Sequence, residues 1–479
     1  MSRSCSTSDC RRMRLRQRGL AVGVLSVVLA AGCQSYERRP LDLAGHGAAF
    51  LARAPDTPEV REFAARLAAE TDGAGAFDTS DGISCAEAEV IALVFNGELR
   101  LARLRAGVTR ASAENAGLWE DPTFGVDLAR ILDGTPEPWK VFGSLGVTIP
   151  ISGRLELEKS LAGEEHAAEL ARVAEREWAV RMAVRRAWGE WSALAVQGDA
   201  TREFMERMDQ ILVVVDAMER AGEMPRAEAR LFRIERATKA LDLAAIESRA
   251  QEVNLRLRGL MGLSPAAPLR LMAGGMGSAH REGTASVDDA DLERRSPAVL
   301  VARTEYEAAE RALALEVRRQ YPDVHLAPGV GREDGQDQVL LGVSVPIPLV
   351  NANRRGIAEA RARREVARSV AETALEQAIG ALRAAEARVA SATRRREALE
   401  SEVVPLVDAQ YEDARRIARL GEVNTLVLLE SLKRQHEAKI ALIDAARDEA
   451  LAGVDRDEVL GPAPNRSSVP SPVPGGEGR

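Results

Sequence analysis

The chain has few of the residues on which metal centres and aromatic cores depend. Aromatic residues make up 4% of its 479 positions, and it contains five histidines and four cysteines. These histidines and cysteines are scattered without metal-ligand spacing, and no HExxH, P-loop, GxGxxG, GxSxG or CxxC motif occurs. We therefore expect no catalytic residue, no metal site and no cofactor, and the protein is not predicted to be an enzyme.

Excess positive charge and long apolar runs are also missing. The net charge of −8 excludes a generally basic nucleic-acid-binding protein. Charged residues nevertheless reach 29%, and alanine contributes much of the 46% apolar fraction. Alanine, arginine, glutamate and leucine at this density indicate long helices that pack through small side chains.

The N-terminus has the pattern of an export signal. A basic segment, "RRMRLRQRG", precedes an apolar core of about a dozen residues, which is too short for a permanent transmembrane helix. "LAAGC" (Leu29–Cys33) resembles the bacterial lipobox, which implies cleavage of residues 1–32 and lipid attachment at Cys33. The alternative is an ordinary signal peptide with an incidental Cys33. Gln34 in place of an aspartate favours sorting to the outer membrane, and no intrachain disulfide is expected because only Cys85 would remain beside Cys33.

The mature sequence is duplicated. "LGVTIPIS" begins at Leu145 and "LGVSVPIP" begins at Leu341, 196 positions later. Other landmarks recur at nearly the same offset, such as "RAGEMP" with "RLGEVN" and "LMGLSP" with "VLGPAP". The duplication predicts two repeats over residues 84–265 and 293–461. A lead-in (33–83), a linker (266–292) and a Pro/Ser/Gly-rich, disordered tail (462–479) complete the predicted organisation.

Each repeat carries two segments in which apolar residues alternate with polar or small ones. They predict strands at about 122–130 and 138–150, and at about 322–330 and 338–348. The length and the strict alternation fit tilted membrane strands, whereas the alternative is a soluble hairpin lying on a helical core. Two isolated hairpins would be marginally stable, which favours closure with other copies.

The flanking segments predict helices whose lengths match. A helix from the capping box Ser84-x-x-Glu87 to about Leu118 precedes the first strand pair. Residues 153–221 contain no proline and predict a helix of roughly 100 Å. The second repeat predicts a long helix over 356–420, with a kink at Pro405. Two shorter helices of about 36 residues, stacked end to end, match one long helix.

This duplicated plan of helix, hairpin, long helix, turn and helix resembles the TolC-type outer-membrane efflux proteins. The resemblance rests on ordered phrases such as "TIPISGRLELEKSLA", "QYPDVHLAPGVG" and "LGVSVPIPLVNANRRGIAEA", and it is greatest to the heavy-metal (CzcC-like) branch. It covers roughly residues 83–461. It implies a mainly α fold with a small β part, and a homotrimer whose strands form a twelve-stranded barrel in the outer membrane above a periplasmic α-helical barrel.

The resemblance also implies a passive conduit and its partners. A periplasmic adaptor protein and an inner-membrane transporter of the RND type would complete a tripartite pump, and outer-membrane lipid would surround the barrel. The alternative is a periplasmic coiled-coil adaptor or a structural lipoprotein without a channel. Against it, the chain has two helical hairpins and four alternating strands, and lacks the β-rich halves of an adaptor.

Candidate functional residues follow from position in this plan. The candidates on the polar strand face, which would line the barrel lumen, are Asp127, Lys140, Ser144, Asp323, His325 and Ser344. Asp209 and Asp408 lie 13 residues before equivalent glycines and would form a carboxylate ring at the periplasmic aperture. The alternative interpretation of Asp209 and Asp408 is that they are ordinary exposed aspartates on helices. The adaptor-docking candidates are the residues of the two helix–helix turns, Gly222 and Glu223 with Gly421 and Glu422.

Two further clusters are interpreted as structural. Glu165, His166 and Glu169 lie near one another on a predicted helix, but their spacing is not that of a di-iron bundle, and a solvated face is expected. Trp178, Trp188 and Trp191 are interpreted as packing anchors of the long helix.

Overall fold

The computed structural model describes residues 36–70, 77–130, 132, 139–272, 289–419 and 425–462. Two compact units divide the chain after Phe50. The described part of the first unit holds most of α2 (Leu43–Leu51), a helix without buried residues.

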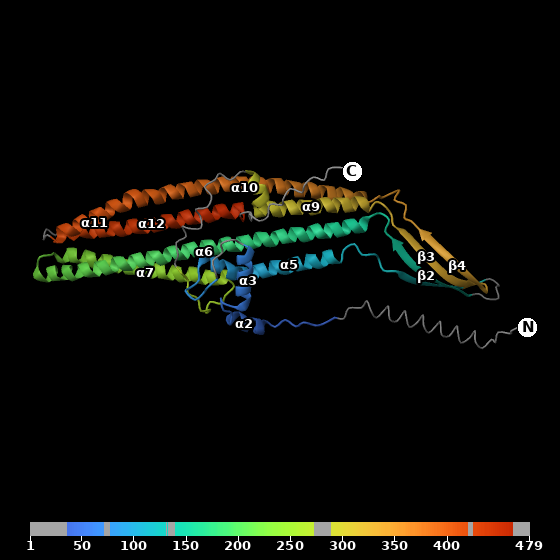
Figure 1. Cartoon of the computed structure of the whole chain (residues 1–479), viewed down its shortest axis with the longest axis horizontal. Helices are drawn as coiled ribbons and strands as arrows, with labels where there is room; N and C mark the ends of the chain where they lie inside the picture. The colour runs from blue at the N-terminus through green and yellow to red at the C-terminus, as the bar shows by residue number, and fades with distance from the viewer. Residues whose placement is uncertain are drawn as a thin grey trace, which may run out of the picture. The chain divides into compact units, whose positions relative to one another are not determined.

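The second unit repeats one order of helices and strands (Figure 1). The elements of the first repeat, with the helix that precedes it, are α3 (Pro58–Glu70), α4 (Cys85–Phe95), α5 (Gly97–Glu114), β1 (Thr123–Arg130), β2 (Trp139–Ile149), α6 (Arg154–Ala221) and α7 (Arg226–Leu260). Those of the second are α8 (Asp289–Arg295), α9 (Pro297–Arg318), β3 (Val324–Glu333), β4 (Gln336–Ser344), α10 (Arg354–Ala398), the π-helical turn η1 (Leu399–Val403), α11 (Val404–Arg419) and α12 (Thr425–Leu460). The predicted duplication and its mainly helical fold are confirmed.

The capping box that begins the first repeat is present. The Ser84 hydroxyl accepts from the Glu87 backbone N–H at 3.3 Å, and the Glu87 carboxylate accepts from the Ser84 N–H at 2.8 Å. The expected single helix to about Leu118 is wrong, because Asn96 interrupts it. The Asn96 side-chain oxygen accepts from the first free N–H groups of α5, and its amide donates to the Leu260 carbonyl.

The two long helices differ in continuity. Helix α6 runs for 68 residues without a break. Its counterpart is divided into α10, η1 and α11, where the Val404 N–H donates to the Leu399 carbonyl five residues back. Pro405 follows directly, and because proline has no N–H the regular i to i−4 pattern cannot continue through it. A π turn thus stands directly before Pro405, where the sequence predicted a kink, and the kink itself stays a prediction.

The four strands form one antiparallel sheet in the order β1-β2-β3-β4. The bounds of β1, β2 and β3 lie close to the predicted ones. Strand β4 ends at Ser344, whereas its predicted end was near residue 348. Pro346 and Pro348 have no N–H to donate to a neighbouring strand, which explains the early end. Strand β3 extends instead to Glu333 and turns into β4 through Asp334 and Gly335, both with positive φ.

Small apolar cores hold the helices together. One core joins α4, α6 and α7 around Ile91 and Trp188, and Trp188 meets Trp191 edge-on with ring centroids 5.5 Å apart. A second joins α6, α7, α11 and α12 near the helix–helix turns, around Phe232 and Tyr411. The interpretation of these tryptophans as packing anchors is confirmed.

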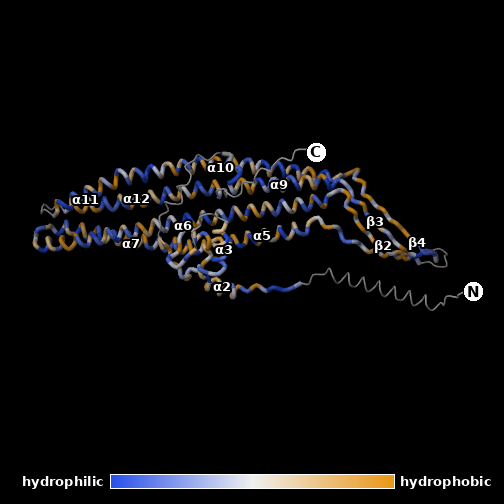
Figure 2. Tube along the Cα trace, viewed as in Figure 1, coloured by the Kyte–Doolittle hydropathy of each residue, from blue (hydrophilic) through white to orange (hydrophobic). Residues whose placement is uncertain are grey.

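Apolar and polar residues interleave along the helices (Figure 2). In the part of the chain that the structure describes, no helix combines the length and the apolar character needed to cross a membrane.

Candidate functional site: the sheet faces and the strand–helix junction

The register of the sheet gathers the apolar strand residues on one face. Residues directly opposite one another in an antiparallel pair point to the same side. Val147, Leu326 and Val343 form one such row across β2, β3 and β4. The other apolar members of this face are Phe124, Val126, Leu128, Trp139, Val141, Leu145, Ile149, Val324, Pro328, Val330, Val339 and Leu341. The sheet therefore presents one continuous apolar face, much of it exposed in the single chain.

The opposite face carries small and polar residues. Five of the predicted lumen candidates, Asp127, Lys140, Ser144, His325 and Ser344, belong to it. The expected separation of apolar and polar strand residues is confirmed, with Phe142 and Leu340 as the large apolar exceptions on the polar face. The Phe142 ring lies against Gly331, where an added Cβ would be 2.1 Å from Cδ1 of the ring.

Two of these candidates contact other residues of the polar face. Lys140 on β2 forms an ion pair with Glu333 at the end of β3. The His325 ring nitrogen Nδ1 lies 3.4 Å from the Thr148 hydroxyl, and Ser344 is opposite His325 on β4. Lys140 and His325 thus have partners within the polar face.

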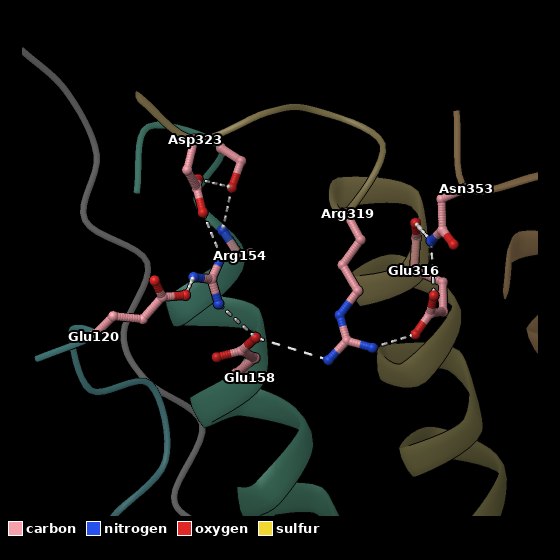
Figure 3. Close-up of polar contacts among 8 residues, drawn as sticks. Glu120, Arg154, Glu158, Glu316, Arg319, Asp323 and Asn353 are labelled. Carbon is pink, nitrogen blue, oxygen red and sulfur yellow. Dashed lines mark hydrogen bonds and ion pairs between the residues drawn. The ribbon is translucent and has the colours of Figure 1, made fainter. Parts of the chain in front are cut away.

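Asp323 differs from the other candidates because it precedes β3 and binds the start of α6. Its carboxylate accepts from Arg154 Nε at 2.7 Å and from the Ser152 hydroxyl at 3.1 Å (Figure 3). The Ser152 oxygen in turn accepts from the Arg154 backbone N–H. The Ser152 hydroxyl therefore provides an acceptor for a free N–H group in the first turn of α6, because the N-cap Gly153 has no side chain to do so.

Arg154 has two further partners at the junction between strands and helices. Besides Asp323, it donates to Glu120 before β1 at 2.8 Å and to Glu158 in the next turn of α6 at 3.1 Å. Hydrogen bonding to Asp323, with a smaller contribution from Glu158, raises the pKa of Arg154 against the effect of its burial. One guanidinium therefore joins the segments before β1, after β2 and before β3.

The second repeat continues this chain of contacts (Figure 3). Arg319, at the end of α9, lies 3.8 Å from Glu158 and 2.5 Å from Glu316. Asn353, the N-cap of α10, donates to the Glu316 carbonyl at 2.8 Å and to its carboxylate at 2.7 Å. All four crossings between helix and strand thus belong to one polar network, which we call the junction network.

The aperture candidates both have partners on the returning helix of their own hairpin. Arg236 Nε donates to Asp209 at 3.0 Å, and Gln435 Nε2 donates to Asp408 at 2.7 Å. Arg236 and Gln435 are themselves equivalent, 199 positions apart like the two aspartates. The same hairpin cross-link therefore occurs in both repeats, and it supports the structural alternative for these aspartates.

The turn after α6 has the expected left-handed glycine. Gly222 has φ +77°, and the Glu223 N–H donates to the Met218 carbonyl at 2.9 Å. Met224 is buried while Glu223 is exposed, and α7 begins directly after Pro225. Gly421 and Glu422 in the second turn lie outside the described residues, as does Cys33.

Sequence reasoning missed a buried ion cluster between α4 and α6. Glu89 accepts from Arg181 at 2.7 Å and from Arg185 at 2.5 Å. Burial, and then the Glu89 charge, raises the pKa of the neighbouring Cys85 thiol to about 12. Glu89 follows the capping-box Glu87 by two residues and precedes an apolar run, and a carboxylate at such a buried position is a signal of a charged partner.

The helix cluster around His166 is engaged locally. His166 Nδ1 lies 3.1 Å from the Thr109 hydroxyl, and Glu169 pairs with Arg172. Within the described ranges, no group of three or more histidine, cysteine, aspartate or glutamate side chains could hold a metal ion.

Comparison with known proteins gives one curated relative. No family model matches the chain. The chain is 22% identical over 244 residues to the cobalt-zinc-cadmium resistance protein CzcC of Cupriavidus metallidurans, a match that covers 50% of this chain. It spans 58% of that protein, less than two thirds of its length.

The solved structures agree over more of the chain. The structure of CusC, a protein that forms a transmembrane channel, matches this chain with a TM-score of 0.67 at 15% identity. The match covers 79% of this chain and 92% of CusC. The outer membrane protein VceC of Vibrio cholerae has a TM-score of 0.64 at 16% identity, over 79% of this chain and 96% of VceC. The chain therefore has the fold of outer-membrane channel proteins. The resemblance to the TolC-type proteins is confirmed at the level of the fold.

Proposed function

We propose that the chain is the outer-membrane channel component of a tripartite efflux pump. Three copies form a twelve-stranded barrel with the apolar sheet face toward lipid and the polar face around a water-filled duct. The long helices form a helical barrel in the periplasm, and the lipid on Cys33 anchors the mature N-terminus. The assembly conducts substrates passively from the periplasm to the exterior.

The observation that carries this proposal is the sheet itself. All four strands present apolar side chains to one side, and Phe124, Val339 and Val343 are exposed there. Strands β1 and β4 each have one partner among the described strands, which leaves two edges open. An exposed apolar sheet with two open edges is an aggregation hazard in water, whereas lipid and edge pairing with other copies remove both problems.

Heavy-metal cations are the proposed substrates, with drugs or other small molecules as the alternative class. The support is the name of the CzcC relative and the acidic side chain of Asp127 on the polar sheet face. Since the described residues offer no metal-binding group, the chain would act as a permissive conduit, and the pump would select the cargo.

The proposed partners are a periplasmic adaptor protein and an inner-membrane transporter of the RND type. The adaptor would dock on the helix–helix turns that carry Glu223 and Glu422. The turn with Glu223 lies at the end of α6 farthest from the sheet (Figure 1). Glu223 is exposed and the adjacent Met224 is buried, so a substitution at Glu223 would change the surface of the turn without changing the helix packing.

The test is to express the full chain and fractionate the envelope. We expect an outer-membrane protein that migrates as a heat-modifiable trimer and produces discrete conductance steps in planar bilayers. A periplasmic adaptor or structural lipoprotein would instead appear without a heat-modifiable barrel or conductance. That outcome would refute the proposal.

A further inference from the structure

The junction network joins the two repeats where β2 meets β3. Arg154, the first residue of α6, reaches across to Asp323 at the foot of β3. The two residues lie 169 positions apart and bring together the end of one hairpin and the start of the next. This contact therefore fastens neighbouring hairpins on the helix side of the sheet.

The duplication places a second arginine at the equivalent position. Arg354 is the first residue of α10, as Arg154 is of α6. Each follows an N-cap in the left-handed region, Gly153 with φ +72° and Asn353 with φ +52°. Arg354 is exposed, and its side chain has no ion pair with any residue that the structure describes. Within one copy there is no following hairpin for it to reach.

An acidic residue is available at the foot of β1. Asp121 is exposed and also lacks an ion pair within the described part of the chain, while its neighbour Glu120 is occupied by Arg154. Thr123 is the residue of the first repeat that corresponds to Asp323, and Asp121 lies two residues before it. The open foot of β4 thus carries a free positive charge, and the open foot of β1 carries a free negative one.

The register of β2 and β3 also transfers to the open edges. Applying the repeat offsets to their pairing places Val343 of one copy opposite Val126 of the next, and Leu341 opposite Leu128. Both pairs join apolar-face residues. A slip of one residue would put apolar residues opposite polar ones, so this register meets the requirement that the faces agree, as registers shifted by two residues also would.

We propose that Arg354 of one copy forms an ion pair with Asp121 of the adjacent copy, with Val343 opposite Val126 in the strand pair above it. This contact repeats, between copies, the fastening that Arg154 and Asp323 provide within a copy. The segment from β4 to α10 is five residues longer than that from β2 to α6, and Asp121 lies two residues before the position equivalent to Asp323. The inference rests on the proposed trimeric channel and deepens it.

Charge reversal and exchange test the ion pair. Arg354→Glu and Asp121→Arg should each lower the heat-modifiable oligomer fraction several-fold, because like charges would meet at each boundary between copies. Combining both substitutions should restore it. Arg355→Glu is the matched control, since Arg355 is the adjacent exposed arginine and has no assigned partner. Equal losses in Arg354→Glu and Arg355→Glu, or no rescue in the double variant, would overturn the ion pair.

Disulfide trapping tests the register independently, in a Cys85→Ala background. Directly opposite residues of antiparallel strands have Cα atoms about 4.5–5.5 Å apart, within the range of disulfides, whereas diagonal neighbours are about 7–8 Å apart. Val126→Cys with Val343→Cys should give covalent dimers and trimers on oxidation. Leu128→Cys with Val343→Cys, the diagonal control, should give few.

The outcomes separate this inference from the proposed function. A parent protein that forms no oligomer defeats the proposed channel itself. A parent that forms the oligomer, combined with stronger cross-linking of the diagonal pair, defeats only the register. An oligomer with efficient Val126–Val343 cross-linking but no rescue by charge exchange retains the register and defeats the ion pair.

Discussion

The rings of Phe204 on α6 and His436 on α12 pack against each other with centroids 4.8 Å apart and planes tilted by 40°. His436 is buried there, next to the core that joins the two helical hairpins. Burial, followed by the charges of Lys239 and Lys439, lowers the pKa of His436 to about 4, and Asp242 opposes this shift. The histidine is therefore neutral in the folded protein at neutral pH.

This contact predicts a loss of stability in mild acid. The unfolded chain takes up a proton near pH 6.5, whereas folded His436 does so only near pH 4. The free energy of unfolding should thus fall as the pH decreases from about 6.5 to about 4, by on the order of 2 kcal/mol from this group. His436→Phe keeps the ring packing and removes the proton uptake. Urea unfolding at pH 7.5 and pH 4.5 should show a smaller acid-induced loss in this variant, and equal losses would contradict the assignment.

The two sheet faces should respond oppositely to a buried charge. Val343→Arg places a cation on the apolar face, one residue before the end of β4. Its cost there should lie below the roughly 2–4 kcal/mol expected at the membrane midplane, and it should lower trimer yield. Ser344→Arg, the matched variant on the polar face, should leave the trimer intact and change its conductance. The measurements are the heat-modifiable fraction on gels and single-channel currents. The reverse pattern would mean that the strand faces are interchanged.

Removing Glu89 should destabilise the helices strongly. Glu89→Ala leaves Arg181 and Arg185 without their shared carboxylate in a partly buried site, and breaking such a pair typically costs about 3–5 kcal/mol. Glu305→Ala, which removes the exposed partner of Arg172, is the control and should cost about 0–1 kcal/mol. The thermal unfolding midpoint is the readout. Equal shifts in both variants would show that Glu89 is not an essential partner.

The lipid anchor has a direct chemical test. Cys33→Ser should leave an unlipidated or uncleaved precursor, while trimer formation through the strands continues. Mass spectrometry of the mature N-terminus identifies the modification. An unmodified N-terminus in the parent protein, upstream or downstream of Cys33, contradicts the lipobox assignment.

The helix–helix turns should tolerate bulk without loss of structure. Glu223→Trp combined with Glu422→Trp should preserve the fold and the trimer, because Glu223 is exposed beside the buried Met224. Efflux, measured as resistance of cells that carry the complete pump, should fail because the adaptor cannot dock. Normal efflux in this variant, or loss of the trimer, would remove the turns as the docking surface.

The parts of the fold that depend on local periodicity could be predicted from the sequence. Alternation predicted all four strands, and the absence of proline predicted α6. The end of β4 was placed too late because the apolar pattern continues through Pro346 and Pro348, although prolines cannot pair there. Asn96 was missed as a helix break because its function depends on the distant Leu260 carbonyl.

The junction network could not be predicted from local pattern. Arg154 and Asp323 are 169 positions apart in the chain, and the sequence pattern placed Asp323 on the polar strand face without a partner. Their contact requires the pairing of β2 with β3 and the packing of α6 beside α9. The duplication does contain one indication of a role for this position, because Arg154 and Arg354 both stand at the start of a long helix.

The π turn at η1 has a mechanical consequence for the duplicated chain. One long helix of each copy is a continuous rod, and its counterpart has a softened point just before Pro405. In a ring of three copies, stiff and compliant rods would alternate around the axis. The backbone of such a ring would approach sixfold symmetry, but its resistance to bending would have only threefold symmetry. The three divided helices would bend, and the three continuous α6 helices would resist bending.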